Sequence, residues 1–413
     1  MPLTITLHNF RPHYTGGSTI QGTIKYTSST PTDFQDIRVT FAGTSKSKIS
    51  KSKGTGAPAA TYRAKCTLFE KERILVTANG ANLAPGQYEY PFEFSFPESV
   101  QEGGRKWVEK TPYRSDANQP LPPSFAFTGG NEERKVNCAI EYKIEAQVSK
   151  PQRSLFSSRG PLFREEVKFN FLPEHARSDG QEDAAVYRQS KDQLFNIRSA
   201  LLLPENRGRS LSVQEKIQGW LIPSQLPRFS FTASFSYPTR VIQGAPLNCS
   251  LEITPHMEDS SVVNTPEILL QSISIYVIGQ TAARAAPSIM GALFAEIDDK
   301  MEILSKTSLR MPMSLSGRID LGDVFGPLAL CHTDVSLRTF NIARTYRLCA
   351  SMVFECAGKT GEFKVSGEEF QVFSSVIGSE KKGFGLEMPL PEEDAPPVYE
   401  DSPPLSTRSF DVI

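Results

Sequence analysis

The sequence lacks a long apolar segment and an excess of charge of either sign. No apolar run approaches the roughly 18 residues that a membrane-spanning helix needs. The 45 Lys and Arg residues nearly balance the 46 Asp and Glu residues, which leaves a net charge of -1. Because nucleic-acid binding depends on a cationic surface, this balance argues against a dedicated DNA-binding protein.

Paired cysteines and a leader-like N-terminus are also missing. The six cysteines lie far apart without a Cys-x-x-Cys pair, so neither a disulfide framework nor a zinc ribbon is expected. Residues 1–8 alternate apolar and polar side chains, whereas a signal peptide has a continuous apolar stretch behind a positive start. We therefore expect a cytoplasmic protein whose thiols are reduced and mostly buried.

The residues that enzymes use do not occur in catalytic patterns. The five histidines show no metal-ligand spacing, and no Gly-x-Ser-x-Gly motif is present. Residues 54–56 lack the third glycine of a dinucleotide site. Cys331 and His332 are adjacent, and neighbouring side chains of a strand point to opposite faces, so they do not form a nucleophile–base pair. We expect no catalytic site, no metal and no cofactor.

What the sequence does contain is a recurrent alternation of apolar and polar residues, which is typical of half-buried strands. The first block of such segments comprises residues 3–7, 20–26, 37–41, 90–96, 140–148 and 167–171. The second block comprises residues 229–237, 247–253, 273–277, 346–356 and 370–372. The pattern predicts an all-β protein with two antiparallel β-sandwiches, in agreement with the domain number that 413 residues suggest.

Polar and charged stretches separate these blocks. We predict an N-terminal sandwich at residues 1–173, a connector at 174–227, a C-terminal sandwich at 228–378 and a disordered tail at 379–413. Residues 213–221 of the connector fit either a short amphipathic helix or an irregular loop with one buried tryptophan. Residues 290–304 fit either a helical face or a bent strand, and the sequence leaves both open.

The two predicted sandwiches resemble each other in sequence. Ile-Gln-Gly occurs before a strand at residues 20–22 and again at 242–244. In each half an apolar strand that ends in glycine follows, at Gly43 and at Gly279. Duplication is the economical explanation, and we expect these glycines to serve a bulge or a turn with positive φ.

Short segments in both halves carry a more specific signal. In the first half they are residues 17–22, residues 83–94 with a Pro-Gly turn before a Tyr/Phe strand, and residues 121–125 leading into 140–144. In the second half the segment is residues 340–348. In this order they resemble the arrestin family, specifically fungal alpha-arrestin-related proteins. The resemblance implies two tandem immunoglobulin-like β-sandwiches joined by a short hinge, acting without a catalytic centre as an adaptor on membrane cargo.

The predicted tail contains eight acidic residues, three basic residues and six prolines. Within it, Pro396, Pro397 and Tyr399 form a Pro-Pro-x-Tyr motif similar to the ligands of WW domains. Two prolines prefer the polyproline II form and dock in an aromatic groove with little loss of entropy, and the tyrosine fills a neighbouring pocket.

In alpha-arrestins such a motif recruits HECT-type ubiquitin ligases that carry WW domains. The resemblance therefore implies a bridge between a ligase and plasma-membrane transporters or sensors, which are then ubiquitinated and endocytosed. It places the protein in the cytoplasm, peripherally at the plasma membrane or endosomes.

Four lysines alternate with serines between two predicted strands, at Lys46, Lys48, Lys51 and Lys53. We expect a solvated hairpin loop. Such a loop would meet anionic lipid, accept ubiquitin or be silenced by phosphorylation of its serines, and a loop without any such role is the alternative.

Two other functions compete with the ligase adaptor. One is an arrestin-fold sorting subunit, similar to that of retromer, which works on endosomes without a ligase. The other is a β-sandwich hydrolase or carbohydrate-binding protein. The sequence indicates neither the cargo nor the signal that activates the adaptor.

Overall fold

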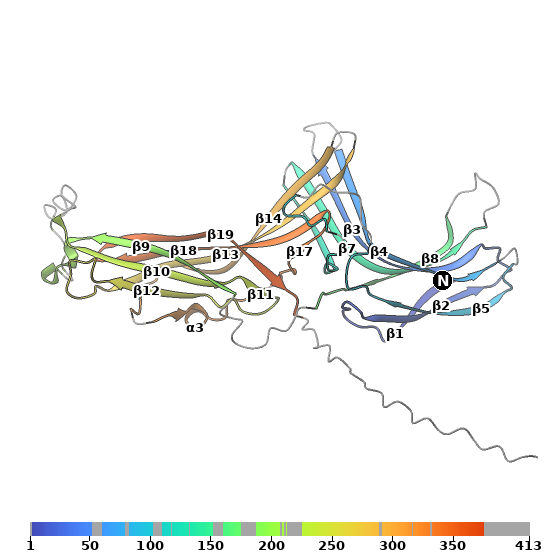
Figure 1. Cartoon of the computed structure of the whole chain (residues 1–413), viewed down its shortest axis with the longest axis horizontal. Coiled ribbons are helices and arrows are strands. Elements are labelled where there is room, and N and C mark those ends of the chain that lie inside the picture. Colours follow the sequence, from blue (N-terminus) through green and yellow to red (C-terminus); the bar gives the residue numbers. More distant parts are fainter. Residues whose placement is uncertain are drawn as a thin grey trace, which may run out of the picture.

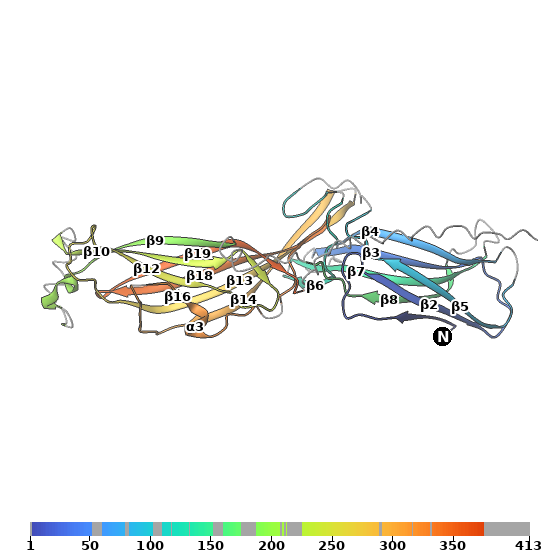
Figure 2. The same cartoon turned by 60° about the horizontal axis from the view of Figure 1, so that its bottom comes forward.

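The computed structural model describes residues 2–51, 60–78, 82–101, 110–116, 118–131, 133–151, 160–174, 187–206, 209, 212, 225–288, 291–315, 317–330 and 333–375. These residues form two β-sandwiches that lie end to end in an elongated molecule (Figure 1 and Figure 2). Nearly all strand pairs are antiparallel, with β11 and β19 as a parallel exception in the described part. The predicted all-β fold with two sandwiches is confirmed.

The N-terminal sandwich consists of two sheets that enclose a common core. One sheet has the strand order β1-β2-β5, and the other has the order β4-β3-β7-β6 with β8 paired to β7. Its strands are β1 (Leu3–His8), β2 (Thr19–Ser28), β3 (Asp36–Lys51), β4 (Ala60–Thr77), β5 (Gly86–Ser95), β6 (Phe125–Gly130), β7 (Arg134–Ser149) and β8 (Pro161–Phe169). Aromatic rings dominate its core: Phe41 packs edge-on against Phe69 and Phe96, with ring centroids 4.9 and 4.8 Å away.

The C-terminal sandwich also consists of two sheets that enclose a common core. One has the strand order β16-β12-β10-β9, and the other has the order β11-β19-β18-β13-β14. Its strands are β9 (Arg188–Arg198), β10 (Arg228–Pro238), β11 (Arg240–Ile242), β12 (Ser250–His256), β13 (Ile268–Ser288), β14 (Gly291–Lys306), β15 (Met311–Pro312), β16 (Ile319–Asp320), β17 (Leu337–Arg338), β18 (Ile342–Cys356) and β19 (Lys359–Phe373). Short helical turns are η1 (Ala200–Leu202), η2 (Pro204–Asn206) and α3 (Leu321–Phe325).

Strand β9 lies inside the segment predicted as a connector, so that prediction is wrong for residues 188–198. The strand pairs with β10 along its whole length and closes one edge of the C-terminal sandwich. Only Phe195 and Ile197 of β9 are buried in the core, because an edge strand with one wet face needs few apolar side chains. Residues 213–221, for which the sequence leaves a helix and an irregular loop open, lie outside the described residues.

The ambiguous segment 290–304 is resolved for its described residues, 291–304, as part of strand β14. It forms a long hairpin with β13 that leaves the C-terminal sandwich and reaches the N-terminal one (Figure 1). The base of the hairpin contributes Val277 and Leu304 to the C-terminal core. Its outer part contributes Ala283 and Ala295 to the N-terminal core. One element is therefore shared by both cores.

The expected role of the repeated glycines, a bulge or a turn with positive φ, is found at Gly43 and Gly244 but not at Gly22 or Gly279. Neither Gly43 nor Gly279 has a positive φ, although the register of β3 against β4 shifts directly after Gly43. A Cβ at Gly43 would lie 2.7 Å from the Tyr142 ring, so this glycine makes room for core aromatics. Gly244 in the second Ile-Gln-Gly does lie in a turn with φ 81°, whereas Gly22 in the first lies within strand β2.

The solvent face of β7 and β8 carries a network of ion pairs. Glu141 accepts hydrogen bonds from Lys46 and, at 2.7 Å, from Lys168. Lys143 donates to both Glu145 and Glu166 at 2.7 Å. The hydrogen bonds from Lys168 and Lys46 lower the pKa of Glu141 from its ordinary 4.5 to about 2, against the opposing effect of partial burial.

We predict that Glu141→Gln reduces the loss of stability in acid. A carboxylate with a depressed pKa stabilises the fold above the unfolded value of 4.5, and that contribution is lost as the pH falls from 4.5 to about 2. At pH 7 the variant should lose about 1–2 kcal/mol of unfolding free energy, and the difference from wild type should vanish near pH 2. Urea unfolding as a function of pH measures both.

Glu165→Gln is the matched control, because Glu165 forms no ion pair with a described residue on the neighbouring strand. A pH-independent difference between Glu141→Gln and wild type would contradict the assignment.

Candidate functional site: the junction between the sandwiches

The inner face of β3 meets the C-terminal sandwich through a buried polar network. Ser45 donates a 2.7 Å hydrogen bond to the side-chain oxygen of Asn341, in the turn before β18. The Asn341 amide donates to the hydroxyl of Ser47 at 3.0 Å, and Ser47 donates to the backbone oxygen of Arg284 at 2.7 Å. Because each buried group finds a partner, the network fixes how the two sandwiches sit against each other.

Arg284 extends this network from β13 toward the loops of the N-terminal sandwich. Its side chain is 1% exposed and donates to the backbone oxygen of Phe340 and, at 3.1 Å, to the hydroxyl of Ser115. The guanidinium lies 4.5 Å from the centre of the Tyr113 ring. Burial lowers the pKa of Arg284, which the nearby Tyr113 partly opposes.

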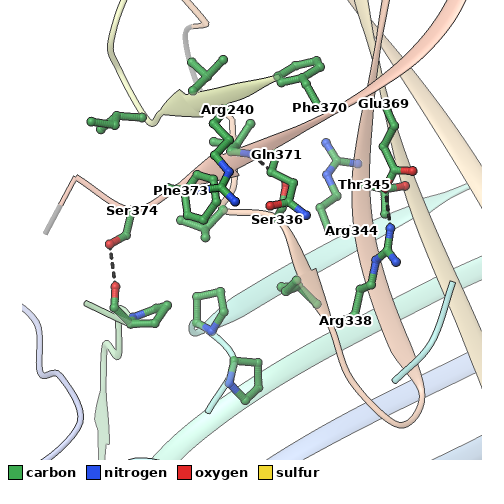
Figure 3. A pocket seen from close by; sticks show the side chains of 18 of the residues that line it. Arg240, Ser336, Arg338, Arg344, Thr345, Glu369, Phe370, Gln371, Phe373 and Ser374 are labelled. Carbon is green, nitrogen blue, oxygen red and sulfur yellow. Dashed lines mark hydrogen bonds and ion pairs between the residues drawn. The ribbon is translucent and has the colours of Figure 1, made fainter. Parts of the chain in front are cut away.

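A cleft of about 760 Å³ opens at this junction. The N-terminal sandwich contributes the proline-rich segment 119–123 and Pro173, and the C-terminal sandwich contributes β11, β17 and the end of β19. Arg240, Arg338 and Arg344 enter it from β11, β17 and β18 (Figure 3). The hydroxyl of Ser374 donates a 2.7 Å hydrogen bond to the backbone oxygen of Pro173 and ties the two sandwiches at the cleft (Figure 3).

Two of the cleft arginines are held by carboxylates. Arg338 pairs with Glu369 across the surface (Figure 3). Arg344 is buried and donates to both oxygens of Asp299, at 2.5 and 2.9 Å. Burial opposes the charge of Arg344, but the hydrogen bonds with Asp299 outweigh it, so its pKa is raised. These two arginines build the wall of the cleft.

The remaining donors of the cleft are less completely paired: Arg188 donates to the Ser250 hydroxyl at 3.3 Å through Nη2 alone. The Arg240 guanidinium is exposed and stacks on the Tyr187 ring, 3.7 Å from its centre, without an ion pair. The Nε atom of Arg188 is buried without a hydrogen-bond partner, and burial followed by the nearby Arg318 lowers the pKa of Arg188. Gln119 is 1% exposed, and its Nε2 atom also has no partner.

This combination of apolar walls with the exposed guanidinium of Arg240 suits an extended ligand that carries carboxylate oxygens. Within the described residues no group of three or more His, Cys, Asp and Glu side chains could hold a metal ion. Sequence reasoning missed the cleft, because its residues come from segments about 250 positions apart, from Gln119 to Ser374. The proline-rich run at 120–123 was the one local signal.

The lysine segment is a strand rather than a hairpin loop, so that prediction is wrong for residues 46–51. Strand β3 continues to Lys51, because Ser45 and Ser47 face the polar junction while Lys46 and Lys48 face solvent. Lys51, at the end of the strand, belongs to the opposite face by its position, and Lys53 lies outside the described residues.

The predicted WW-binding residues Pro396, Pro397 and Tyr399 lie outside the described residues, as do Cys331 and His332. The WW-binding role of the tail therefore stays a prediction from the sequence.

We predict that Gly279→Ala breaks the Arg344–Asp299 pair. A Cβ at this position would lie 2.5 Å from Nη2 of Arg344 and 3.0 Å from an oxygen of Asp299, which is closer than packed atoms allow. Displacing a buried guanidinium from its carboxylate should cost about 2–3 kcal/mol of unfolding free energy. Urea unfolding of the full chain measures this loss.

Gly317→Ala provides the control for glycine removal, since a Cβ at Gly317 meets nothing within 4 Å and its φ is not positive. Equal unfolding midpoints for the two variants would refute the role of Gly279.

Comparison with known proteins identifies the N-terminal part of the chain. Residues 3–102 match the model of the arrestin (or S-antigen) N-terminal domain. No curated protein sequence matches the chain. Among the described residues no helix is long and apolar enough to cross a membrane. The matched segment supplies β1 to β5 of the first of two tandem β-sandwiches, so this part of the chain is similar to the arrestin N-terminal domain.

Proposed function

We propose that this protein is a non-enzymatic adaptor that brings a WW-domain HECT ubiquitin ligase to membrane cargo and thereby promotes ubiquitination and endocytosis of that cargo. One combination carries the proposal: an arrestin N-terminal domain at residues 3–102 and a Pro-Pro-x-Tyr motif at residues 396–399 occur in the same chain. The body would engage the cargo, and the tail would engage the ligase.

The cleft between the sandwiches is the surface we assign to cargo. Its exposed Arg240 guanidinium, which forms no ion pair with a described residue, complements the carboxylates of an extended acidic segment. The cytoplasmic segments of transporters and sensors supply such chains. An adaptor requires only binding at this site, and the paired arginines Arg338 and Arg344 would keep the walls rigid while Arg240 binds the ligand.

We predict that Tyr399→Ala weakens binding of the full-length protein to WW domains of a HECT ligase by about tenfold or more, because the tyrosine fills its own pocket. Calorimetric titration measures the affinity. Val398→Ala is the control, since the motif accepts any residue at that position. Unchanged affinity of Tyr399→Ala would remove the ligase arm, and recovery of coat subunits in place of a ligase would favour the endosomal sorting scaffold.

We predict that Arg240→Glu abolishes selective binding of acidic cargo segments. The substitution places a carboxylate where the guanidinium would bind the carboxylate of the ligand, so the two negative charges repel each other. Binding of the full-length protein to an array of cytoplasmic segments of membrane proteins measures the preference. Lys359→Glu makes the same charge change on the exposed β18–β19 turn and should bind as wild type does. Identical binding profiles for wild type and Arg240→Glu would exclude the cleft as the cargo site.

A further inference from the structure

One solvent face of the N-terminal sandwich has two halves that differ in how their charges are paired. In one half the cations form ion pairs with carboxylates, and in the other they do not. The half built from β7 and β8 carries the ion-pair network around Glu141, Glu145 and Glu166. There, like charges that lie directly opposite, such as Lys143 and Lys168, are compensated by diagonal carboxylates. The other half lies toward the tip of the β3–β4 hairpin, where β3, β4 and β7 run side by side (Figure 1).

This second half, which we call the cationic face, consists of Lys48, Arg63, Lys65 and Lys135. The strand register places them on one surface: Lys48 lies opposite Arg63, and Lys65 lies opposite Lys46. Lys135 lies two residues from Asn137, which is opposite Lys48 on β7. All four side chains are exposed, and none forms an ion pair with a described residue.

Opposed like charges on neighbouring strands, about 5 Å apart, destabilise a sheet. In the ion-paired half this cost is offset by carboxylates, whereas no described carboxylate forms an ion pair with the four side chains of the cationic face. Ser50 and Thr61 lie between the cations and bond to each other at 3.2 Å, and Asn137 donates to Thr128 at 3.0 Å. Among the described residues the face is therefore a polar and positive sheet surface, with no exposed apolar side chain between these cations.

We propose that the cationic face binds the surface of an anionic lipid bilayer. An array of unpaired cations on one sheet surface, with intervening hydroxyl and amide groups, complements a plane of phosphate and carboxylate headgroups. A folded acidic protein would need shape complementarity and a buried centre, which a polar sheet face does not offer. Because Lys48 and the buried Ser47 alternate on β3, the strand that contacts the bilayer is also the strand that contacts the C-terminal sandwich. This inference is independent of the ligase and cargo proposals.

The test is co-sedimentation of the full-length protein with vesicles of phosphatidylcholine alone and with added phosphatidylserine. Wild type should bind only the anionic vesicles, and binding should weaken as salt rises. The variant Lys48→Gln, Arg63→Gln, Lys65→Gln, Lys135→Gln should bind about a hundredfold or more weakly, since each of the four cations near such a surface contributes roughly fivefold. A control variant neutralises four exposed cations of the C-terminal sandwich, Lys306, Arg310, Lys359 and Lys364, and should bind as wild type does.

Thermal unfolding distinguishes loss of a binding face from loss of the fold. Removing unpaired like charges should leave the midpoint of the quadruple variant unchanged or raise it at low salt. A lowered midpoint would show that the cations have structural partners and would overturn the proposal. Equal vesicle binding by the quadruple variant and wild type would also overturn it. So would binding of wild type to polyglutamate but not to anionic vesicles, which would assign the face to an acidic protein.

Discussion

The structure depends on one shared element, the hairpin of β13 and β14. Its base is buried in the C-terminal core through Val277 and Leu304, while Ala283, Ala285 and Ala295 are buried in the N-terminal core. The alanines let the hairpin approach the neighbouring sheet closely, because no larger side chain intervenes. Separating the sandwiches would expose part of a core, so the hairpin sets their relative placement and with it the shape of the cleft.

Polar groups refine the placement that the apolar contacts allow. Ser45, Ser47 and Asn341 satisfy one another at the junction, and any slip along β3 would leave buried donors without acceptors. The same strand presents Lys46 and Lys48 to solvent. Alternation of serine and lysine therefore serves two surfaces at once, an internal one that joins the sandwiches and an external one that is strongly positive.

The cations of this protein fall into two groups, those that form ion pairs with carboxylates and those that do not. Arg338, Arg344 and Lys143 are held by carboxylates and contribute to fixed structure. Arg240 stacks on an aromatic ring but has no carboxylate partner among the described residues. The four cations of the cationic face, two of which lie directly opposite each other, also have none there. We propose that both sets of unpaired cations bind an external anion, and the two surfaces differ in form: one is a cleft, and the other is the face of a sheet.

The sequence by itself determined the strands whose inner faces are apolar, such as residues 140–148 and 229–237, because alternation is local and needs no knowledge of the partner strand. It also indicated the resemblance of the first domain to arrestins, through residues 17–22 and 83–94, which lie within the matched residues 3–102.

Only the tertiary structure decided the remaining elements. Edge strand β9 has two core side chains, β14 takes part of its burial from the other sandwich, and the serines of β3 are buried against polar partners. The sequence pattern of such residues indicates a loop or a helix, because the residues that bury them lie far away in the sequence. The cleft and the cationic face likewise exist only once the strands are in register.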